Sequence, residues 1–307
     1  MTFNEGMQID PDAVSSGGGP GRGGKIALGG GAGGLIVLVL ALLLGGDPGS
    51  LIGDLTGSDN QQSQPAEGTP AHCKTGADAN KYADCRVALT TQSLNSVWGT
   101  EFNKQTGRQY AKPKVNLFSG AIATGCGNAT SDVGPFYCPP DRTAYFDVTF
   151  FQELVDRFGS SGGPLAQEYV VAHEIGHHVQ NLLGDIGRAQ RDPRGPESGA
   201  VRTELQADCY AGIWAHFADK TPSPGGGPPF LKPLSENDIR DALSAASAVG
   251  DDRIQKASQG RVNREAWTHG SSEQRQKWFL TGYQTGQVKA CDTYSASNLD
   301  APPALRR

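Results

Sequence analysis

The stretch Ala166-Gln-Glu-Tyr-Val-Val-Ala-His-Glu-Ile-Gly-His-His-Val-Gln-Asn181 carries an HExxH motif, which begins at His173 and ends at His177. The stretch contains no proline and its apolar residues recur at helical spacing, so it predicts a helix. Two histidines four residues apart lie on one face of a helix, where both imidazoles reach a single zinc ion. Glu174 lies beside them, and its carboxylate is placed to take a proton from a water on the metal.

Gly176 is unusual in the middle of a helix, because glycine costs a helix about 1 kcal/mol relative to alanine. We therefore expect another part of the chain to approach the helix backbone closely at this position. The alternative for the whole motif is a surface helix that carries two histidines by chance. Only six histidines occur in 307 residues, which makes such a coincidence the less favoured interpretation.

A catalytic zinc usually has three protein ligands and one water, so a third ligand must come from elsewhere in the chain. The metzincin pattern is excluded, because Gln180 and Leu183 occupy the positions where that class has glycine and histidine. Residues 202–214 read as a helix with Glu204 and Asp208 one turn apart. We expect Glu204 to bind the metal and Asp208 to accept a hydrogen bond from a ligand histidine, which fixes its tautomer. The alternative is a solvated acidic face, but neighbouring apolar residues indicate a buried helix.

Composition narrows the class of protein. The chain has 307 residues and a net charge of −5, and its lysines and arginines form no long basic stripe. Nucleic acid is therefore not expected as a partner. The length allows one large domain or two small ones.

Residues 1–25 are rich in glycine and serine, lack apolar periodicity and are expected to form a disordered cytoplasmic N-terminus. Residues 26–46 contain no charge and are long enough to cross the roughly 30 Å apolar core of a bilayer as one helix. A cleaved signal peptide is one alternative, although residues 44–47 make a poor cleavage site, and a buried core helix is another. We predict a single transmembrane helix that anchors the chain in the membrane.

The charges that flank this run predict its orientation. Arg22 and Lys25 precede the run, whereas Asp47 and Asp54 follow it. The positive-inside rule then places the N-terminus in the cytoplasm and the rest of the chain outside. Beyond the run we expect a flexible linker, a folded domain and a disordered polar tail, at residues 47–71, 72–294 and 295–307 respectively.

All six cysteines fall within the predicted domain, and an even number in an exported domain indicates disulfides. Two pairs are close neighbours in the sequence, Cys73 with Cys85 and Cys126 with Cys138, which leaves Cys209 for Cys291. Sequence alone does not decide among the 15 possible connectivities. No CxxC motif occurs, so a thiolate zinc site is not expected.

Shorter patterns predict the elements around the HExxH helix. The apolar spacing of residues 86–105 suits a helix, and residues 150–158 suit another. Residues 114–119 and 142–147 read as strands. The strand at 142–147 is either a sheet edge that binds an extended peptide or an ordinary core strand, and the two interpretations stay open.

Together these stretches resemble a bacterial family of predicted neutral zinc metallopeptidases, the YpfJ-like proteins, within the broader gluzincin group. The resemblance covers the domain from about His72 to Asp292, and the N-terminal anchor also resembles members of that family. It implies that His173, His177 and Glu204 bind zinc and that Glu174 is the catalytic base. The fold expected is α+β, a mainly helical zincin-like domain with a small sheet, preceded by the single transmembrane helix. The matching stretches are Asp141–Asp147, Tyr169–Gln180, Glu204–Trp214 and Thr268–Trp278.

His269 lies in the last of these stretches, in a loop or at a helix start. Its position resembles that of loop histidines in related membrane-linked gluzincins, which implies that it stabilises the oxyanion of a tetrahedral intermediate. A histidine that caps the following helix is the alternative, and Tyr210 and Tyr145 are alternative oxyanion donors. His178 points off the ligand face and is expected either to be structural or to support a metal ligand from outside. His72 and His216 have no evident role in the site.

We therefore expect a membrane-anchored zinc metallopeptidase that hydrolyses peptide bonds of a peptide or protein substrate outside the cytoplasmic membrane. The alternative is a non-catalytic, zinc-stabilised interaction module on the cell surface. Glu174 argues against this alternative, because a structural zinc site needs neither a base nor an open position for water. The sequence indicates neither the substrate nor the oligomeric state.

Overall fold

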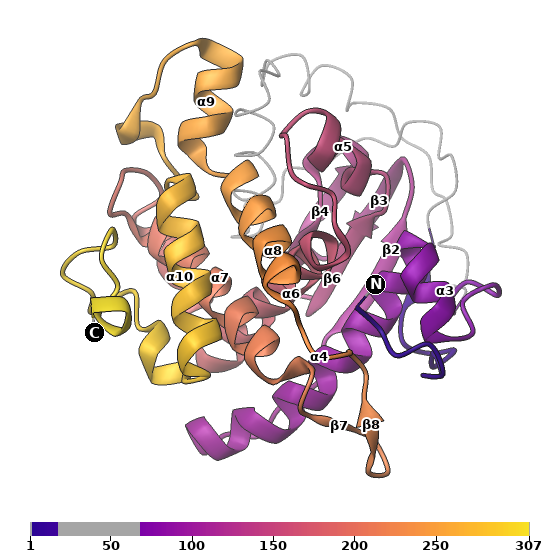
Figure 1. Cartoon of the computed structure of the whole chain (residues 1–307). Coiled ribbons are helices and arrows are strands. Elements are labelled where there is room, and N and C mark those ends of the chain that lie inside the picture. Colours follow the sequence, from indigo (N-terminus) through magenta and orange to yellow (C-terminus); the bar gives the residue numbers. More distant parts are fainter. Residues whose placement is uncertain (1, 18–67, 307) are drawn as a thin grey trace.

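The computed structural model describes residues 2–17 and 68–306, and helix α6 (Pro164–Leu183) lies at the centre of this part of the chain (Figure 1). The helix contains the predicted stretch 166–181. It begins after Gly163 with a proline in its first turn and ends at Gly184, whose φ of 88° is left-handed. Most residues of α6 are buried, because helices pack on one side of it and a sheet packs on the other.

The other helices confirm the predicted helical segments; α4 and α7 are a few residues longer than predicted, whereas α5 ends two residues earlier. Residues 86–105 lie in α4, 150–158 begin with α5 and 202–214 lie in α7. Helix α6 packs against α4, α7 and α8, and α7 packs along α10. The helices besides α6 are α3 (Gly76–Lys81), α4 (Ala83–Thr106), α5 (Phe150–Asp156), α7 (Gly199–Ala218), α8 (Glu236–Ala248), α9 (Asp251–Gln259) and α10 (Ser272–Thr285).

The sheet beside α6 has four strands in the order β1-β2-β6-β5. Its strands are β1 (Ser15–Ser16), β2 (Lys114–Phe118), β6 (Thr143–Asp147) and β5 (Phe136–Cys138). Strands β2 and β6 confirm the two predicted strands. Because β6 is hydrogen-bonded to β2 on one side and to β5 on the other, the strand at 142–147 is a core strand. The interpretation of that strand as a sheet edge is wrong, and the edge next to it is β5. Two hairpins complete the strands, β3 (Ala121–Thr124) with β4 (Gly127–Thr130), and β7 (Pro222–Ser223) with β8 (Gly227–Pro229).

Helices α7 and α10 are in backbone contact. A Cβ atom on Gly282 of α10 would lie 1.9 Å from the carbonyl oxygen of Cys209, and one on Gly212 of α7 would lie 2.0 Å from that of Phe279. Only glycine fits such a crossing. The disulfide between Cys209 and Cys291 ties the segment after α10 to the same region of α7. The other two predicted pairs, Cys73–Cys85 and Cys126–Cys138, are also present.

Residues 2–17 are packed onto the domain, which corrects the disorder expected for this part of residues 1–25; residues 1 and 18–25 lie outside the described residues. Phe3 is fully buried and pairs with Leu231 in an antiparallel bridge. Strand β1 extends the sheet by pairing in parallel with β2. Composition was a poor guide here, because a few apolar side chains in a short polar segment are enough to hold it on the domain when a surface is available. The hydroxyl of Thr2 donates a hydrogen bond to Glu168 of α6.

Residues 295–306 are also ordered, in contrast to the disorder expected for the tail at 295–307. The indole of Trp278 donates a hydrogen bond to the carbonyl of Leu299, and the Leu299 side chain is buried. Residues 303–306 form a short 3₁₀ helix.

The predicted transmembrane helix at residues 26–46 lies outside the described residues, as does most of the predicted linker at 47–71. In residues 2–17 and 68–306, no helix combines the length and the apolar character that a membrane span requires.

Glu168 makes stability depend on pH. Burial raises the pKa of this fully buried carboxyl to about 7, although Thr2 and Arg86 act in the opposite direction. Between the ordinary pKa near 4.5 and 7, the folded chain therefore binds more protons than the unfolded chain, so its free energy of unfolding falls as pH rises. We expect a contribution on the order of 3 kcal/mol. Denaturant unfolding measures the free energy of unfolding of wild type and Glu168→Gln at pH 4.5 and at pH 8. From the lower to the higher pH, Glu168→Gln should gain stability relative to wild type by this amount. A difference between the two chains that does not change with pH would contradict this assignment.

Candidate active site

Three predicted site residues meet in one buried group. Helix α6 places His173 and His177 one turn apart, with ring centroids 4.8 Å from each other. Helix α7 carries Glu204, whose Oε2 lies 3.1 Å from His173 Nε2 and whose Oε1 lies 3.4 Å from His177 Nε2. Each of the three residues is less than 10% exposed. The carboxylate thus faces the outer nitrogens of both imidazoles.

Gly176 explains why the two helices lie so close. A Cβ atom at this position would lie 2.9 Å from the carbonyl oxygen of Ala207 on α7. The expectation that part of the chain approaches the backbone here is confirmed. Without a side chain at 176, α7 comes near enough for Glu204 to reach both histidines.

This group has the composition of a zinc site. One ligand atom from each of His173, His177 and Glu204 lies within 4.8 Å of the others. Two imidazole nitrogens and one carboxylate oxygen are ligands that zinc takes, and three protein ligands leave a position open for water or substrate. A buried carboxylate also needs a positive partner, and a bound zinc ion meets that need. The residues present therefore fit zinc.

Asp208 binds the nitrogen of His173 that faces away from Glu204, as the spacing on α7 predicts. Its Oδ1 lies 2.8 Å from His173 Nδ1, and it accepts a hydrogen bond from the hydroxyl of Tyr169. Burial alone would raise the pKa of Asp208, but the charge of Arg275 lowers it below its ordinary value. The charged carboxylate accepts the Nδ1 proton, which leaves Nε2 of His173 free to bind metal.

Two residues with no predicted role complete this support. Arg275 of α10 donates to both oxygens of Asp208, at 2.8 Å from Nε and 3.0 Å from a terminal nitrogen. The Oε1 atom of Gln180 accepts a hydrogen bond from His177 Nδ1 at 2.8 Å. Gln180 is three residues after His177 on the same helix, so helical spacing alone could have predicted this contact. Arg275 lies 67 residues from Asp208, and no local pattern links the two.

Glu174 lines the same pocket as the three ligands. Burial raises its pKa, and the nearby His177 and His173 oppose that rise. A carboxylate with a raised pKa is a stronger base at neutral pH than an exposed one, and its acid form can also return the proton.

His269 also lines the pocket, in the loop before α10. The fully buried Asp251 holds this loop, since one of its oxygens accepts the backbone N–H groups of Thr268, His269 and Gly270 at 2.7 to 3.0 Å. Burial lowers the pKa of His269, but Glu204 and Asp251 raise it further, so the net shift is upward. The cap of α10 is Ser271, whose hydroxyl accepts the Gln274 N–H, so capping is not the role of His269.

The alternative donors and the other histidines lie elsewhere. Tyr145 donates to Asp141 and Tyr210 packs edge-on against Trp98, and neither lines the pocket. His178 contacts the Tyr137 hydroxyl and the Ala111 carbonyl through its two nitrogens, which is the structural role expected. His216 contacts the carbonyl of Tyr283.

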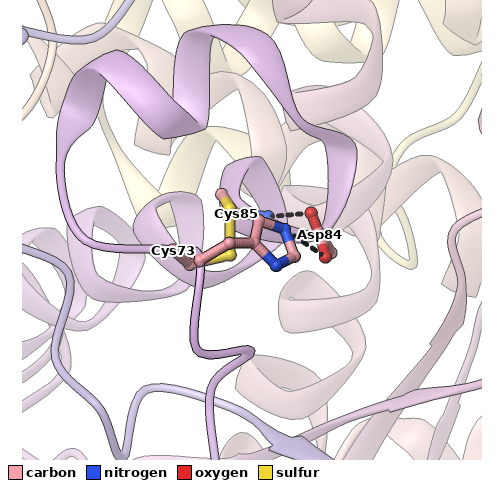
Figure 2. Close-up of side chains that lie close together, drawn as sticks. Cys73, Asp84 and Cys85 are labelled. Atoms are coloured by element: carbon pink, nitrogen blue, oxygen red, sulfur yellow. Dashed lines mark hydrogen bonds and ion pairs between the residues drawn. A yellow bond between two sulfur atoms is a disulfide. The ribbon is translucent and has the colours of Figure 1, made fainter.

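A second group of possible metal ligands surrounds the Cys73–Cys85 disulfide (Figure 2). His72 Nε2 lies 3.0 Å from Asp84 Oδ2 beside it. The two sulfur atoms are bonded to each other, so neither is available as a thiolate. This group is therefore no competitor for the zinc site in the disulfide-bonded chain.

Comparisons with known proteins cover nearly the whole chain. A family model described as "Putative neutral zinc metallopeptidase" matches residues 4–294. The chain is 56% identical to Rv2575 of Mycobacterium tuberculosis over 299 residues, which are 97% of this chain and 100% of that protein. It is 39% identical to YpfJ of Escherichia coli K12 over 292 residues, which are 93% of this chain and 95% of that protein. Both relatives are named as uncharacterized proteins. No solved structure matches the chain.

Replacing the carboxylate behind His173 should weaken metal binding. In Asp208→Asn the amide holds the imidazole less firmly and no longer supports its basicity, so we expect zinc affinity to fall by about 10- to 100-fold. Competition with a chromophoric chelator measures the affinity. Glu236→Gln, at a side chain that is 90% exposed, is the matched control. Equal zinc affinity in Asp208→Asn and the control would rule out this role for Asp208.

Proposed function

Since the chain belongs to this neutral zinc metallopeptidase family, we propose that it is a zinc-dependent peptidase that hydrolyses internal peptide bonds. The observation that carries the proposal is the placement of Glu174 in one pocket with His173, His177 and Glu204. A base beside a three-ligand metal group that opens to a pocket is the arrangement that metal-assisted hydrolysis requires.

Each residue of the group has a distinct task in this proposal. His173, His177 and Glu204 would hold zinc, which supplies positive charge that polarises a carbonyl and makes a water more acidic. Glu174 takes a proton from the attacking water and then delivers it to the leaving amine. Its raised pKa suits both steps.

His269 is the proposed stabiliser of the oxyanion. It lines the same pocket, and Asp251 fixes the loop that carries it. Its raised pKa favours the protonated imidazole, which donates a hydrogen bond to a developing negative charge.

Strand β5 is the proposed binding site for the substrate backbone. It is the edge of the sheet, and residues 133–137 on and before it line the pocket. An edge strand offers unpaired backbone groups to an extended peptide, which can add to the sheet as a further strand. The peptide-binding sheet edge that the sequence suggested at residues 142–147 is thus proposed for the neighbouring strand, β5.

The non-catalytic surface module is the less supported alternative. A structural zinc site is closed by four ligands, whereas the three found here adjoin a pocket that also contains Glu174. A location outside the cytoplasm remains part of the proposal, and the three disulfides support it because such bonds persist in oxidising compartments.

Removing the base should abolish activity and leave the metal in place. Glu174→Gln keeps the shape of the side chain but cannot accept a proton, so we expect kcat to fall by about 100-fold or more at equal zinc content. Cleavage of a peptide library by the full chain, followed by mass spectrometry, measures this loss, and zinc content is determined alongside. If Glu174→Gln cleaved as fast as the wild type, Glu174 would not be the base.

A further inference from the structure

The pocket beside the metal-ligand group is mainly apolar. Its lining comes from β5 and the residues just before it, from helices α5, α6, α7, α9 and α10, and from the segments that follow α5 and α8. Gly134 is needed for this packing, because a Cβ atom there would lie 3.2 Å from the Phe150 ring and its φ is 68°. The apolar wall consists of Phe136, Phe150, Phe158, Val170, Val249 and Ile254.

The charged groups in the lining have partners already. Arg275 is bound to Asp208 through both of its carboxylate oxygens. His269 lies 3.4 Å from the Asp251 carboxylate. Apart from these two, the charges in the lining are Glu174 and the three metal ligands. Away from Glu174 and the metal ligands, which the proposed reaction uses, the lining therefore offers no unpaired charge to bind a charged substrate side chain.

We infer that the pocket binds a large apolar side chain, such as that of leucine or phenylalanine, directly next to the scissile bond. This inference rests on the proposed peptidase function. Burial of such a side chain favours it over alanine by roughly 10- to 100-fold in kcat/KM. An acidic side chain should be cleaved less well still, because nothing in the apolar wall compensates its desolvation.

The test uses the zinc-loaded full chain and peptides that differ at one position. A peptide library and mass spectrometry first map the cleavage sites, and matched peptides with leucine, alanine or aspartate beside the scissile bond are then compared. A preference for leucine of 10-fold or more supports the inference. Cleavage that is indifferent to this residue overturns the inference and leaves the peptidase function standing. No cleavage of any peptide counts against the function itself.

Variants of residues in the apolar wall test whether this wall sets the preference. Ile254→Asp places a carboxylate in the wall and should reduce the preference for leucine while improving cleavage next to lysine or arginine. Val262→Asp, at a side chain that is 44% exposed, is the control and should leave the preference unchanged. Phe158→Ala enlarges the same wall without adding a charge, and should shift the preference towards tryptophan even where Ile254→Asp fails to fold.

A second inference comes from the N-terminal segment, residues 2–17, and stands independently of the pocket. Its backbone is bound along its whole length. The backbone N–H of Lys232 donates to the carbonyl of Thr2 at 2.7 Å, and the backbone N–H of Asn4 donates to the carbonyl of Phe230 at 2.9 Å. The Asn80 amide binds both the N–H and the carbonyl of Phe3.

The middle and end of the segment are held as firmly. Ile9 donates to the Lys74 carbonyl at 2.9 Å, and Gly76 donates to that of Met7 at 2.7 Å. Strand β1 then pairs with β2, and the side chains of Ser15 and Asn116 meet at 2.9 Å. The family match begins at residue 4, so it includes residues 4–17 of this segment.

These contacts restrict how the chain can meet a membrane. The uncharged run at 26–46 has the length for one crossing only. One crossing would put the N-terminal segment and the domain on opposite sides, where β1 and β2 cannot pair. We propose that residues 2–17 and 68–306 lie on the same side of the membrane. This replaces the single-pass orientation expected from the flanking charges.

Single-cysteine labelling tests the topology in bacterial spheroplasts that express the full chain. All six native cysteines are in disulfides, so Asp12→Cys and Gln109→Cys each introduce one free thiol at an exposed position. A membrane-impermeant maleimide should react with both in intact spheroplasts, or with both only after lysis. Reaction of one before lysis and of the other only afterwards overturns the proposal.

Cross-linking tests the docking of β1 in the same cells. The double variant Ser15→Cys/Asn116→Cys should form a disulfide, seen as a linked peptide by mass spectrometry, because the native side chains are in contact. Either single variant is the control and should give no such peptide. Absence of the linked peptide in the double variant would contradict docking of the segment in the cell.

Discussion

The Asp208 carboxylate is fully buried, and its two oxygens are shared among His173, Tyr169 and Arg275. A buried charge is tolerated only when it is paired and hydrogen-bonded, and removal of one partner from such a group typically costs about 3–5 kcal/mol. The three partners come from α6 and α10, whereas Asp208 belongs to α7. The need to satisfy this one charge therefore sets the mutual positions of the three helices that carry the site.

Close helix packing makes this arrangement possible. Gly176 lets α6 approach α7, and Gly212 and Gly282 let α7 approach α10. The first contact brings Glu204 to the two histidines, and the second brings Arg275 to Asp208. The metal ligands are thus held by a scaffold in which backbone contacts set the distances and buried ion pairs set the side-chain orientations.

The active-site helix is supported from a second direction by the start of the chain. Thr2 reaches Glu168, which lies on α6 before the HExxH motif, and Phe3 fills a space in the core. The N-terminal segment is therefore a structural part of the domain.

Much of the site could be predicted from local spacing. The periodicity of an α-helix places residues three and four apart on one face, so His173 with His177, and Glu204 with Asp208, followed from the sequence alone. The close approach at Gly176 could be predicted too, because glycine destabilises a helix and is expected there only where a side chain would not fit. The predicted strands and the three disulfide pairs also correspond to those observed.

Contacts between elements far apart in the chain could not be derived this way. Arg275 meets Asp208, Asp251 holds the loop of His269, and residues 2–17 join a sheet that otherwise begins at residue 114. The order of residues 2–17 and 295–306 could not be predicted for the same reason. The composition of a segment says nothing about the surface on which the segment packs. By itself the sequence determined the residues on each helical face and the chemistry they offer, because helix geometry is local. Only the tertiary structure decided which faces meet, because packing and the pairing of buried charges depend on the whole chain.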